Sequence, residues 1–189
     1  MTLLTVLTAP TLRAAVTARP VQHGFTLVEL MISLVVLAVL TTLGAPSFFE
    51  WLQNSQTRSG AEAVLNGIQV ARSEAIQRNA RVMVVFVPPS TGWTVSVDAD
   101  DTVIQSRSGA EGTSNAVLTA TPAAATTITF GALGSVTTNK DTSTPITQVD
   151  MTNSQFAGAR TLRVVITGGG GIRMCDPSPS LTLTDPRRC

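Results

Sequence analysis

The sequence predicts an α+β protein in which a long N-terminal α-helix, half transmembrane and half amphipathic, packs on a C-terminal antiparallel β-sandwich-like head. Three patterns lead to this prediction. An apolar span follows a basic N-terminal stretch, a helical pattern continues from that span, and short β-branched segments separated by turn residues fill the rest of the chain. The basic N-terminal stretch is expected at residues 1–24, and the transmembrane half of the helix at residues 25–45. The amphipathic half is expected at residues 46–80 and the β-rich head at residues 81–189.

Residues 25–45 form the apolar span and contain one ionisable residue, Glu29. A helix over this range rises about 31 Å, which is the thickness of the hydrocarbon core of a bilayer. Residues 1–24 carry Arg13 and Arg19 but no acidic residue, and the positive-inside rule therefore predicts a cytoplasmic location for that end. The remainder of the chain is expected on the opposite side of the membrane.

A secretory signal peptide has a similar outline, but its apolar region is only about 7–15 residues long and a small-residue cleavage site follows it. No A-x-A pattern follows this span. A plain signal anchor would explain the length of the span but not its carboxylate. Because a charge inside a membrane helix costs roughly 2.5–3.5 kcal/mol, Glu29 predicts a function and a partner, which we expect to be a terminal amine on another subunit.

The helical pattern continues beyond Pro46. Apolar residues recur there at three- and four-residue steps, which predicts a face that lies on a sheet; they are Ala61, Leu65, Ile68, Ala71, Ala75 and Ile76. Charged residues occupy the other positions, and Arg58 and Glu62 have the i, i+4 spacing of a helical ion pair.

The head is expected to consist of short strands that form an antiparallel sandwich or a two-sheet head. Candidate strands are residues 81–87, 92–98, 102–107, 116–120, 126–130, 133–137, 146–151 and 161–167. The second and third candidates flank an acidic turn and predict a hairpin. The four glycines at 168–171 are expected to form a flexible or bulged connection between the last strand and the C-terminal tail.

No catalytic residue, cofactor or metal site is expected, and the chain is not predicted to be an enzyme. The single histidine, His23, lies in the N-terminal stretch. If this stretch is removed, as the resemblance of the following junction implies, the mature chain has no histidine for a triad or metal site. The acidic turn at Asp98, Asp100 and Asp101 lacks the glycine and distal glutamate of an EF-hand loop. We interpret it as a solvated turn.

The junction Gly24-Phe25-Thr26-Leu27-Val28-Glu29-Leu30-Met31 resembles the class III leader junction of type IV pilins and type II secretion pseudopilins. The resemblance implies that a prepilin peptidase cuts after Gly24 and methylates the new amino terminus at Phe25. It also implies that Glu29 of one subunit neutralises the Phe25 amine of its neighbour during filament assembly. A leader of 24 residues is long for this group of proteins.

Further segments resemble the GspH/FimT group of minor pilins and pseudopilins; they are residues 47–52, 71–79, 92–95, 173–177 and 185–189. The resemblance implies a pilin-like fold and a FimT/FimU-like minor pilin that helps to initiate a type IV pilus or forms part of its tip. Its partners would be other minor and major pilins, and it would cross the bacterial inner membrane once with its head in the periplasm. A GspH-type pseudopilin of the type II secretion system shares every one of these motifs.

Two cysteines, Cys175 and Cys189, bracket a tail rich in Pro, Ser and Thr. A disulfide between them fits an oxidising compartment and would close a loop of about 15 residues, worth about 3 kcal/mol. A metal site is the competing interpretation, but two cysteines without a nearby histidine do not complete a tetrahedral zinc shell. The disulfide is therefore the prediction.

DNA binding is a second hypothesis, because some FimT-like proteins are associated with DNA uptake through a basic C-terminal region. Candidate phosphate contacts are Arg160, Arg163, Arg173, Arg187 and Arg188. Leader removal takes away two of the 13 basic residues and none of the 12 acidic residues, leaving a formal charge of −1, which does not suggest a nucleic-acid partner. The alternative is that these arginines pair with acids and cap strand edges.

Overall fold

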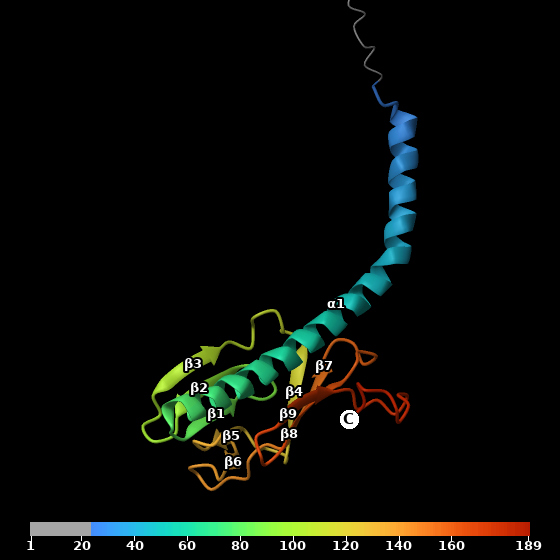
Figure 1. The fold of residues 1–189 in the computed structure, drawn as a ribbon. Coiled ribbons are helices and arrows are strands. Elements are labelled where there is room, and N and C mark those ends of the chain that lie inside the picture. The colour runs from blue at the N-terminus through green and yellow to red at the C-terminus, as the bar shows by residue number, and fades with distance from the viewer. Residues whose placement is uncertain (1–23) are drawn as a thin grey trace, which may run out of the picture. The chain divides into compact units, whose positions relative to one another are not determined.

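The computed structural model describes residues 24–189 and contains one helix and nine strands in this range (Figure 1). The predicted leader up to residue 23, including His23, lies outside the described residues. Helix α1 spans Leu27–Arg78. The strands are β1 (Val82–Phe86), β2 (Trp93–Val97), β3 (Val103–Arg107), β4 (Ala116–Thr121), β5 (Thr127–Phe130), β6 (Val136–Thr137), β7 (Gln148–Asn153), β8 (Leu162–Ile166) and β9 (Ile172–Cys175).

Both ends of α1 are capped by local hydrogen bonds. At the start, the backbone N–H of Glu29 donates to Thr26 Oγ1 at 3.2 Å. At the end, Asn79 has a left-handed conformation (φ 48°), and the N–H groups of Asn79 and Ala80 donate to the carbonyls of Ile76 and Ala75. This is the Schellman pattern of a helix C-terminus. Helix α1 therefore ends at Arg78, and β1 begins at Val82.

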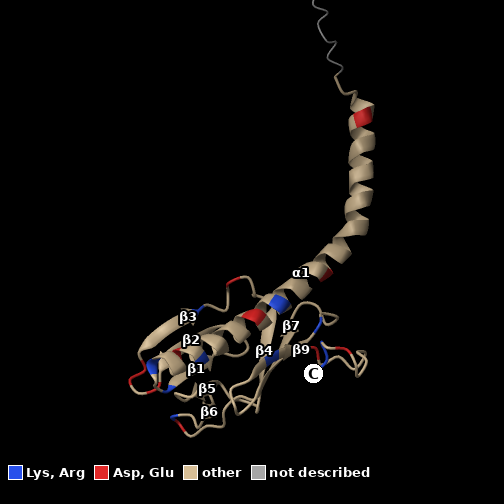
Figure 2. Ribbon diagram, viewed as in Figure 1, with Lys and Arg blue, Asp and Glu red and all other residues tan. Residues whose placement is uncertain are grey.

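The chain divides into two units, one ending at Leu43 and the other spanning Gly44–Cys189. Among the described residues, α1 is the one helix long and apolar enough to cross a bilayer, and no residue of its apolar part is buried. Between Leu27 and Leu43 the only charged residue is Glu29, whereas charged residues are frequent in the second unit (Figure 2).

The head contains two antiparallel sheets, as the sequence predicts. The five-stranded sheet has the order β3-β2-β1-β5-β6 and the four-stranded sheet the order β4-β7-β8-β9. The expected hairpin is formed by β2 and β3. The segment expected at 133–137 is shorter than predicted, because residues 131–135 form a turn closed by the Gly131 N–H and the Ser135 carbonyl at 2.9 Å.

Strand β9 was not predicted, so residues 168–171, which were expected to form a flexible or bulged connection to the tail, connect two strands instead. These residues form the tight turn between β8 and β9, where the Thr167 N–H donates to the Gly171 carbonyl at 2.9 Å. Gly170 has φ 80° and lies against the backbone of Gly134, so a side chain there would be both strained and blocked. The turn therefore requires glycine at position 170, whereas Gly168 and Gly169 have open space at their Cβ positions.

The core lies between the second half of α1 and the two sheets. Small residues of α1 are buried in this core, and they include Gly60, Ala61, Gly67 and Ala71. The largest buried side chains are Trp93, Phe86, Phe130, Ile68, Leu118, Ile128, Ile146 and Met151. Four of the predicted face residues are fully buried and Leu65 is half-buried. Ile76 is 49% exposed, contrary to the prediction. It lies one helical step of about 100° from Ala75, off the centre of the buried stripe.

Gly67 of α1 lies against the buried ring of Trp93. A Cβ built at Gly67 would lie 2.8 to 3.0 Å from three ring atoms of Trp93. We expect Gly67→Ala to lower the free energy of unfolding by about 1 to 2 kcal/mol, because overpacking outweighs the gain in helix propensity. Thermal unfolding of the detergent-solubilised chain measures the change. Gly44→Ala is the matched control, because no atom lies within 4 Å of its Cβ position; equal effects of the two substitutions would contradict the prediction.

Candidate assembly helix and disulfide-closed tail

The N-terminal junction is the first candidate site. Phe25 is 83% exposed, and the apolar side chains that follow it along α1 are also exposed. Thr26 and Glu29 occupy the N-cap and N3 positions of α1, which is the T-x-x-E pattern of a capping box. Of the two reciprocal bonds of a capping box, the structure shows the one from the Glu29 N–H to Thr26 Oγ1, a helix cap that our sequence interpretation missed. This cap means that Glu29 stands in the first helical turn, where a negative charge also interacts favourably with the helix dipole.

Glu29 has no charged partner within the part of the chain that the structure describes. The ion pairs found among residues 24–189 all lie between residues 58 and 187. One of them is the predicted helical pair, in which Arg58 Nε lies 2.8 Å from Glu62 Oε1. The carboxylate of Glu29 is thus available to a partner from outside this set of residues.

Polar side chains of α1 join the helix to the head just beyond the apolar span. The Gln53 Oε1 atom accepts hydrogen bonds from Asn115 and Asn153 at 3.2 and 3.1 Å. The Asn54 Oδ1 atom accepts the backbone N–H of Arg160 at 2.9 Å. These bonds link α1 to the ends of β4, β7 and the loop before β8.

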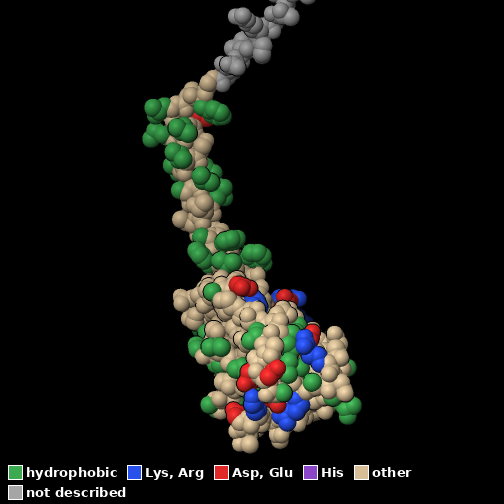
Figure 3. Space-filling model, turned by 90° about the vertical axis from the view of Figure 1, so that its left-hand side faces the viewer, with side chains coloured by type: hydrophobic (Ala, Val, Ile, Leu, Met, Phe, Trp, Pro, Cys, Tyr) green, Lys and Arg blue, Asp and Glu red, His purple; other side chains and the backbone are tan. Residues whose placement is uncertain are grey.

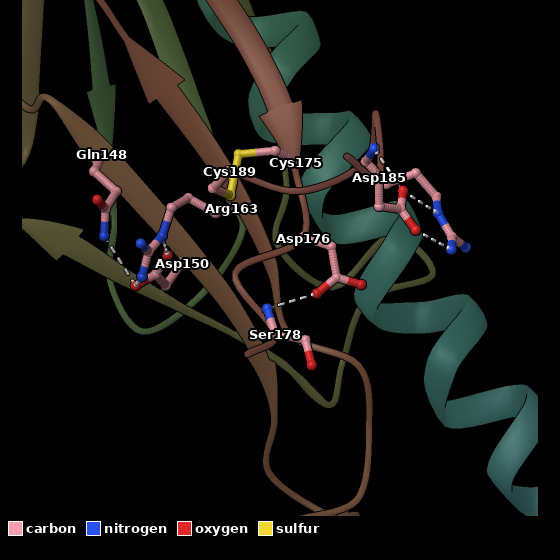
Figure 4. The surroundings of a disulfide bond; sticks show 9 residues. Gln148, Asp150, Arg163, Cys175, Asp176, Ser178, Asp185 and Cys189 are labelled. Carbon is pink, nitrogen blue, oxygen red and sulfur yellow. Dashed lines mark hydrogen bonds and ion pairs between the residues drawn. A yellow bond between two sulfur atoms is a disulfide. The ribbon is translucent and has the colours of Figure 1, made fainter. Parts of the chain in front are cut away.

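The C-terminal tail is the second candidate site, and it is closed by the disulfide between Cys175 and Cys189 (Figure 4). Their Cα atoms are 5.1 Å apart, and Cys175 is buried. The Asp176 N–H donates to the Arg187 carbonyl at 2.7 Å, and the Cys189 N–H donates to the Asp176 carbonyl at 3.2 Å. The last residues of the chain are thereby held beside the end of β9.

Asp176 is a buried carboxylate at the centre of the closed tail. Its Oδ1 atom accepts the Ser178 N–H at 2.9 Å (Figure 4). Its Oδ2 atom lies 2.9 Å from Arg160 Nη2, but this contact is an ion pair without hydrogen-bond geometry. The pair connects the tail to the loop before β8.

Three of the five arginines predicted to contact DNA are paired with carboxylates. Arg160 pairs with Asp176, Arg163 with Asp150, and Arg187 with Asp185. Arg163 lies directly opposite Asp150 in the β7–β8 register and donates two hydrogen bonds to it at 2.7 and 3.0 Å (Figure 4). These bonds raise the pKa of Arg163. The sequence analysis gave such pairing with acidic residues as the alternative to DNA binding.

The remaining two arginines differ from each other. Arg188 donates a hydrogen bond from Nη1 to the Leu181 carbonyl at 3.2 Å, within the tail. Arg173 is exposed on β9. Arg160 and Arg187 line one cavity of about 360 Å³ together with Arg58, so the fold brings two of the five predicted residues together.

The pairing in the tail has a measurable electrostatic consequence. Side-chain and backbone hydrogen bonds from Arg187 lower the pKa of Asp185 from its ordinary 3.8 to about 2. Because the folded-state pKa is depressed, this interaction supports the tail at pH values above 3.8 and is lost as the pH falls through about 2. We expect Arg187→Ala to return the pKa of Asp185 toward 3.8, as followed by the NMR shift of its carboxyl carbon. Arg173→Ala is the control and should leave that pKa unchanged; equal shifts would contradict the prediction.

The sequence suggested a solvated acidic turn, but one of its three carboxylates is buried. Asp98 is 7% exposed and forms an ion pair with Arg81 Nε at 2.9 Å. Asp100 and Asp101 are exposed, and Asp101 pairs with Lys140. Within residues 24–189, no three His, Cys, Asp or Glu side chains gather in a way that could hold a metal ion.

A long N-terminal helix that leaves its apolar first half exposed and packs its second half on antiparallel sheets defines the class of pilin-like subunits. The family model of the type II transport protein GspH matches residues 60–170, and that of the prokaryotic N-terminal methylation motif matches residues 19–45. The chain therefore belongs to the GspH family. No match is found among curated proteins.

One solved structure shows the same fold, and two further structures are similar at lower scores. The crystal structure of the Pseudomonas aeruginosa type IV minor pilin FimU is similar with a TM-score of 0.53 and 17% identity, over 66% of this chain and 91% of that one. A second crystal form of FimU has a TM-score of 0.49 and 18% identity, over 62% and 90% of the two chains. The solution structure of Escherichia coli GspH has a TM-score of 0.47 and 14% identity, over 68% and 94%. At these identities the first likeness shows the fold alone.

Proposed function

We propose that the mature chain is a FimT/FimU-like minor pilin that enters a type IV pilus, where it helps to initiate assembly or forms part of the tip. The observation that carries this proposal is Glu29, a lone carboxylate in the first turn of an exposed apolar helix and within the methylation motif. A membrane helix with an unpaired charge needs a partner, and a neighbouring subunit supplies one as its terminal amine.

The processing of the chain follows from the same junction. A prepilin peptidase cuts between Gly24 and Phe25 and methylates the Phe25 amine. The helix over residues 25–45 then anchors the subunit in the bacterial inner membrane, with the head in the periplasm before the subunit enters the filament. The disulfide between Cys175 and Cys189 supports this location, because such bonds persist in oxidising compartments.

The alternative is a GspH-type pseudopilin of the type II secretion system. Family membership supports both assignments, because pilins and pseudopilins share the helix, the junction and the two-sheet head. No observation on the described residues favours the third function, DNA binding, since three of the five candidate arginines are neutralised by carboxylates.

Two experiments in the native host test the proposal. Mass spectrometry of the purified protein should show an amino terminus at Phe25 that carries one methyl group; an intact leader, or a cut elsewhere, would refute the processing step. Deletion of the gene should reduce surface pili and leave type II secretion intact. Loss of secretion with normal piliation would instead identify a pseudopilin.

A further inference from the structure

Three aromatic residues follow the apolar span, and each is more than half exposed. Phe48, Phe49 and Trp51 are 60%, 60% and 64% exposed. The rings of Phe48 and Trp51 are neighbours, with centroids 6.0 Å apart. Exposed apolar side chains continue along the helix to this region (Figure 3). Adjacent large aromatic side chains left in solvent indicate an interaction surface.

The three side chains lie on two different sides of α1. Phe49 is four residues before Gln53 and therefore shares its side of the helix; both line a cavity of about 620 Å³ with Asn115 and Phe156. Trp51 is two residues before Gln53, which is about 200° around the helix. A single neighbouring helix would require one apolar stripe, whereas a lipid interface surrounds the helix and suits aromatic residues on several sides.

The position of these residues along α1 fits the headgroup layer of a bilayer. Phe48 and Trp51 follow Ala45, the last residue of the span, by helical rises of about 4.5 and 9 Å. The headgroup layer on each side of the hydrocarbon core is about 5 to 8 Å thick. Side chains on a helix lean toward its N-terminus, which brings the Trp51 ring back toward the span. Trp and Phe provide large apolar surfaces, and the indole N–H of Trp also suits the polar side of this layer.

We propose that Phe48, Phe49 and Trp51 form an aromatic collar that binds the headgroup layer of the membrane on the side of the head. The collar fixes how deeply the helix sits in the bilayer before the subunit is extracted into the filament. This inference rests on the proposed membrane anchoring of residues 25–45. Its partner is a phospholipid surface, and a neighbouring subunit is the alternative that the test must distinguish.

Tryptophan fluorescence in vesicles provides the test, because Trp93 is 1% exposed and remains a constant background in the core. The full chain is reconstituted into vesicles of phosphatidylethanolamine and phosphatidylglycerol. These vesicles also contain phosphatidylcholine brominated either near the headgroup or near the end of the acyl chain. We expect the shallow label to quench the Trp51 emission about twofold more than the deep label. In the Trp51→Phe variant, quenching by both labels should be nearly lost.

A second variant separates failure of the collar from failure of the anchor. Leu37→Trp in the Trp51→Phe background places a reporter in the middle of the span and should be quenched more strongly by the deep label. If this reporter behaves as expected and Trp51 is quenched by neither label, or more by the deep one, the collar proposal is wrong and the anchor stands. If the reporter at position 37 escapes the deep label, the membrane anchor is wrong and the collar with it.

Discussion

Glu29→Gln is expected to lower incorporation of the subunit into filaments about 100-fold, because an unneutralised amine in lipid costs roughly 3 kcal/mol. In the proposed assembly, the carboxylate of Glu29 neutralises the methylated amine at Phe25 of the neighbouring subunit. Removal of the carboxylate leaves that amine without a partner at the position where the subunit leaves the membrane. The measurement is the ratio of subunit in sheared filaments to subunit in membranes, quantified by immunoblot in the native host.

Glutamine is the informative replacement because residue 29 also lies at the helix start, where its backbone N–H donates to Thr26 Oγ1 and this bond does not depend on the charge of the side chain. Glu29 occupies the N3 position behind the Thr26 cap, and glutamine also suits a capping box at that position. The substitution therefore removes the charge and keeps the helix start. Glu50→Gln, on the same helix but outside the span, is the matched control and should assemble normally. Normal assembly of Glu29→Gln, or an equal defect in both variants, would show that the charge at position 29 does not direct assembly.

The double substitution Cys175→Ala with Cys189→Ala is expected to lower the free energy of unfolding by about 3 kcal/mol. The disulfide joins two cysteines that are 14 positions apart in the sequence. It holds the tail in which Asp176 is buried beside Arg160. Alanine at position 175 keeps a small apolar side chain in a buried site. Chemical denaturation of the detergent-solubilised chain measures the loss, and limited proteolysis should cut between residues 176 and 189.

A reductant provides the internal control for this prediction. It should destabilise the unmodified chain by a similar amount and leave the double variant unchanged. If the variant loses less than about 1 kcal/mol and its tail resists proteolysis, the hydrogen bonds of the tail suffice to hold it without the disulfide. That result would contradict the view that the covalent bond stabilises the tail.

Local patterns in the chain were sufficient to predict helix α1. An apolar run with one carboxylate, followed by three- and four-residue periodicity, predicted a helix that continues over residues 46–80, and α1 ends at Arg78. This worked because helical structure depends on neighbours a few residues apart. Six of the eight candidate strands match strands of the structure to within one residue at each end. The candidate at 146–151 is displaced by two residues from β7, and β6 is shorter than its candidate. The two-sheet head was predicted from the regular spacing of turns. The capping box at Thr26 was visible in the sequence as T-x-x-E, but we had not used it.

The sequence by itself determined the α+β class, the exposed span with Glu29, the amphipathic half of α1 and the pairing of Cys175 with Cys189. Only the tertiary structure decided that the glycine run builds a β8–β9 turn against Gly134 and that Asp98 is buried. It also decided that Arg160 and Arg163, two of the five candidate DNA-binding arginines, meet carboxylates. The reason is that these features depend on residues far apart in the chain. Asp150 and Arg163 become opposite only when β7 and β8 adopt their register, and Arg160 meets Asp176 only when the closed tail folds back beside the loop before β8.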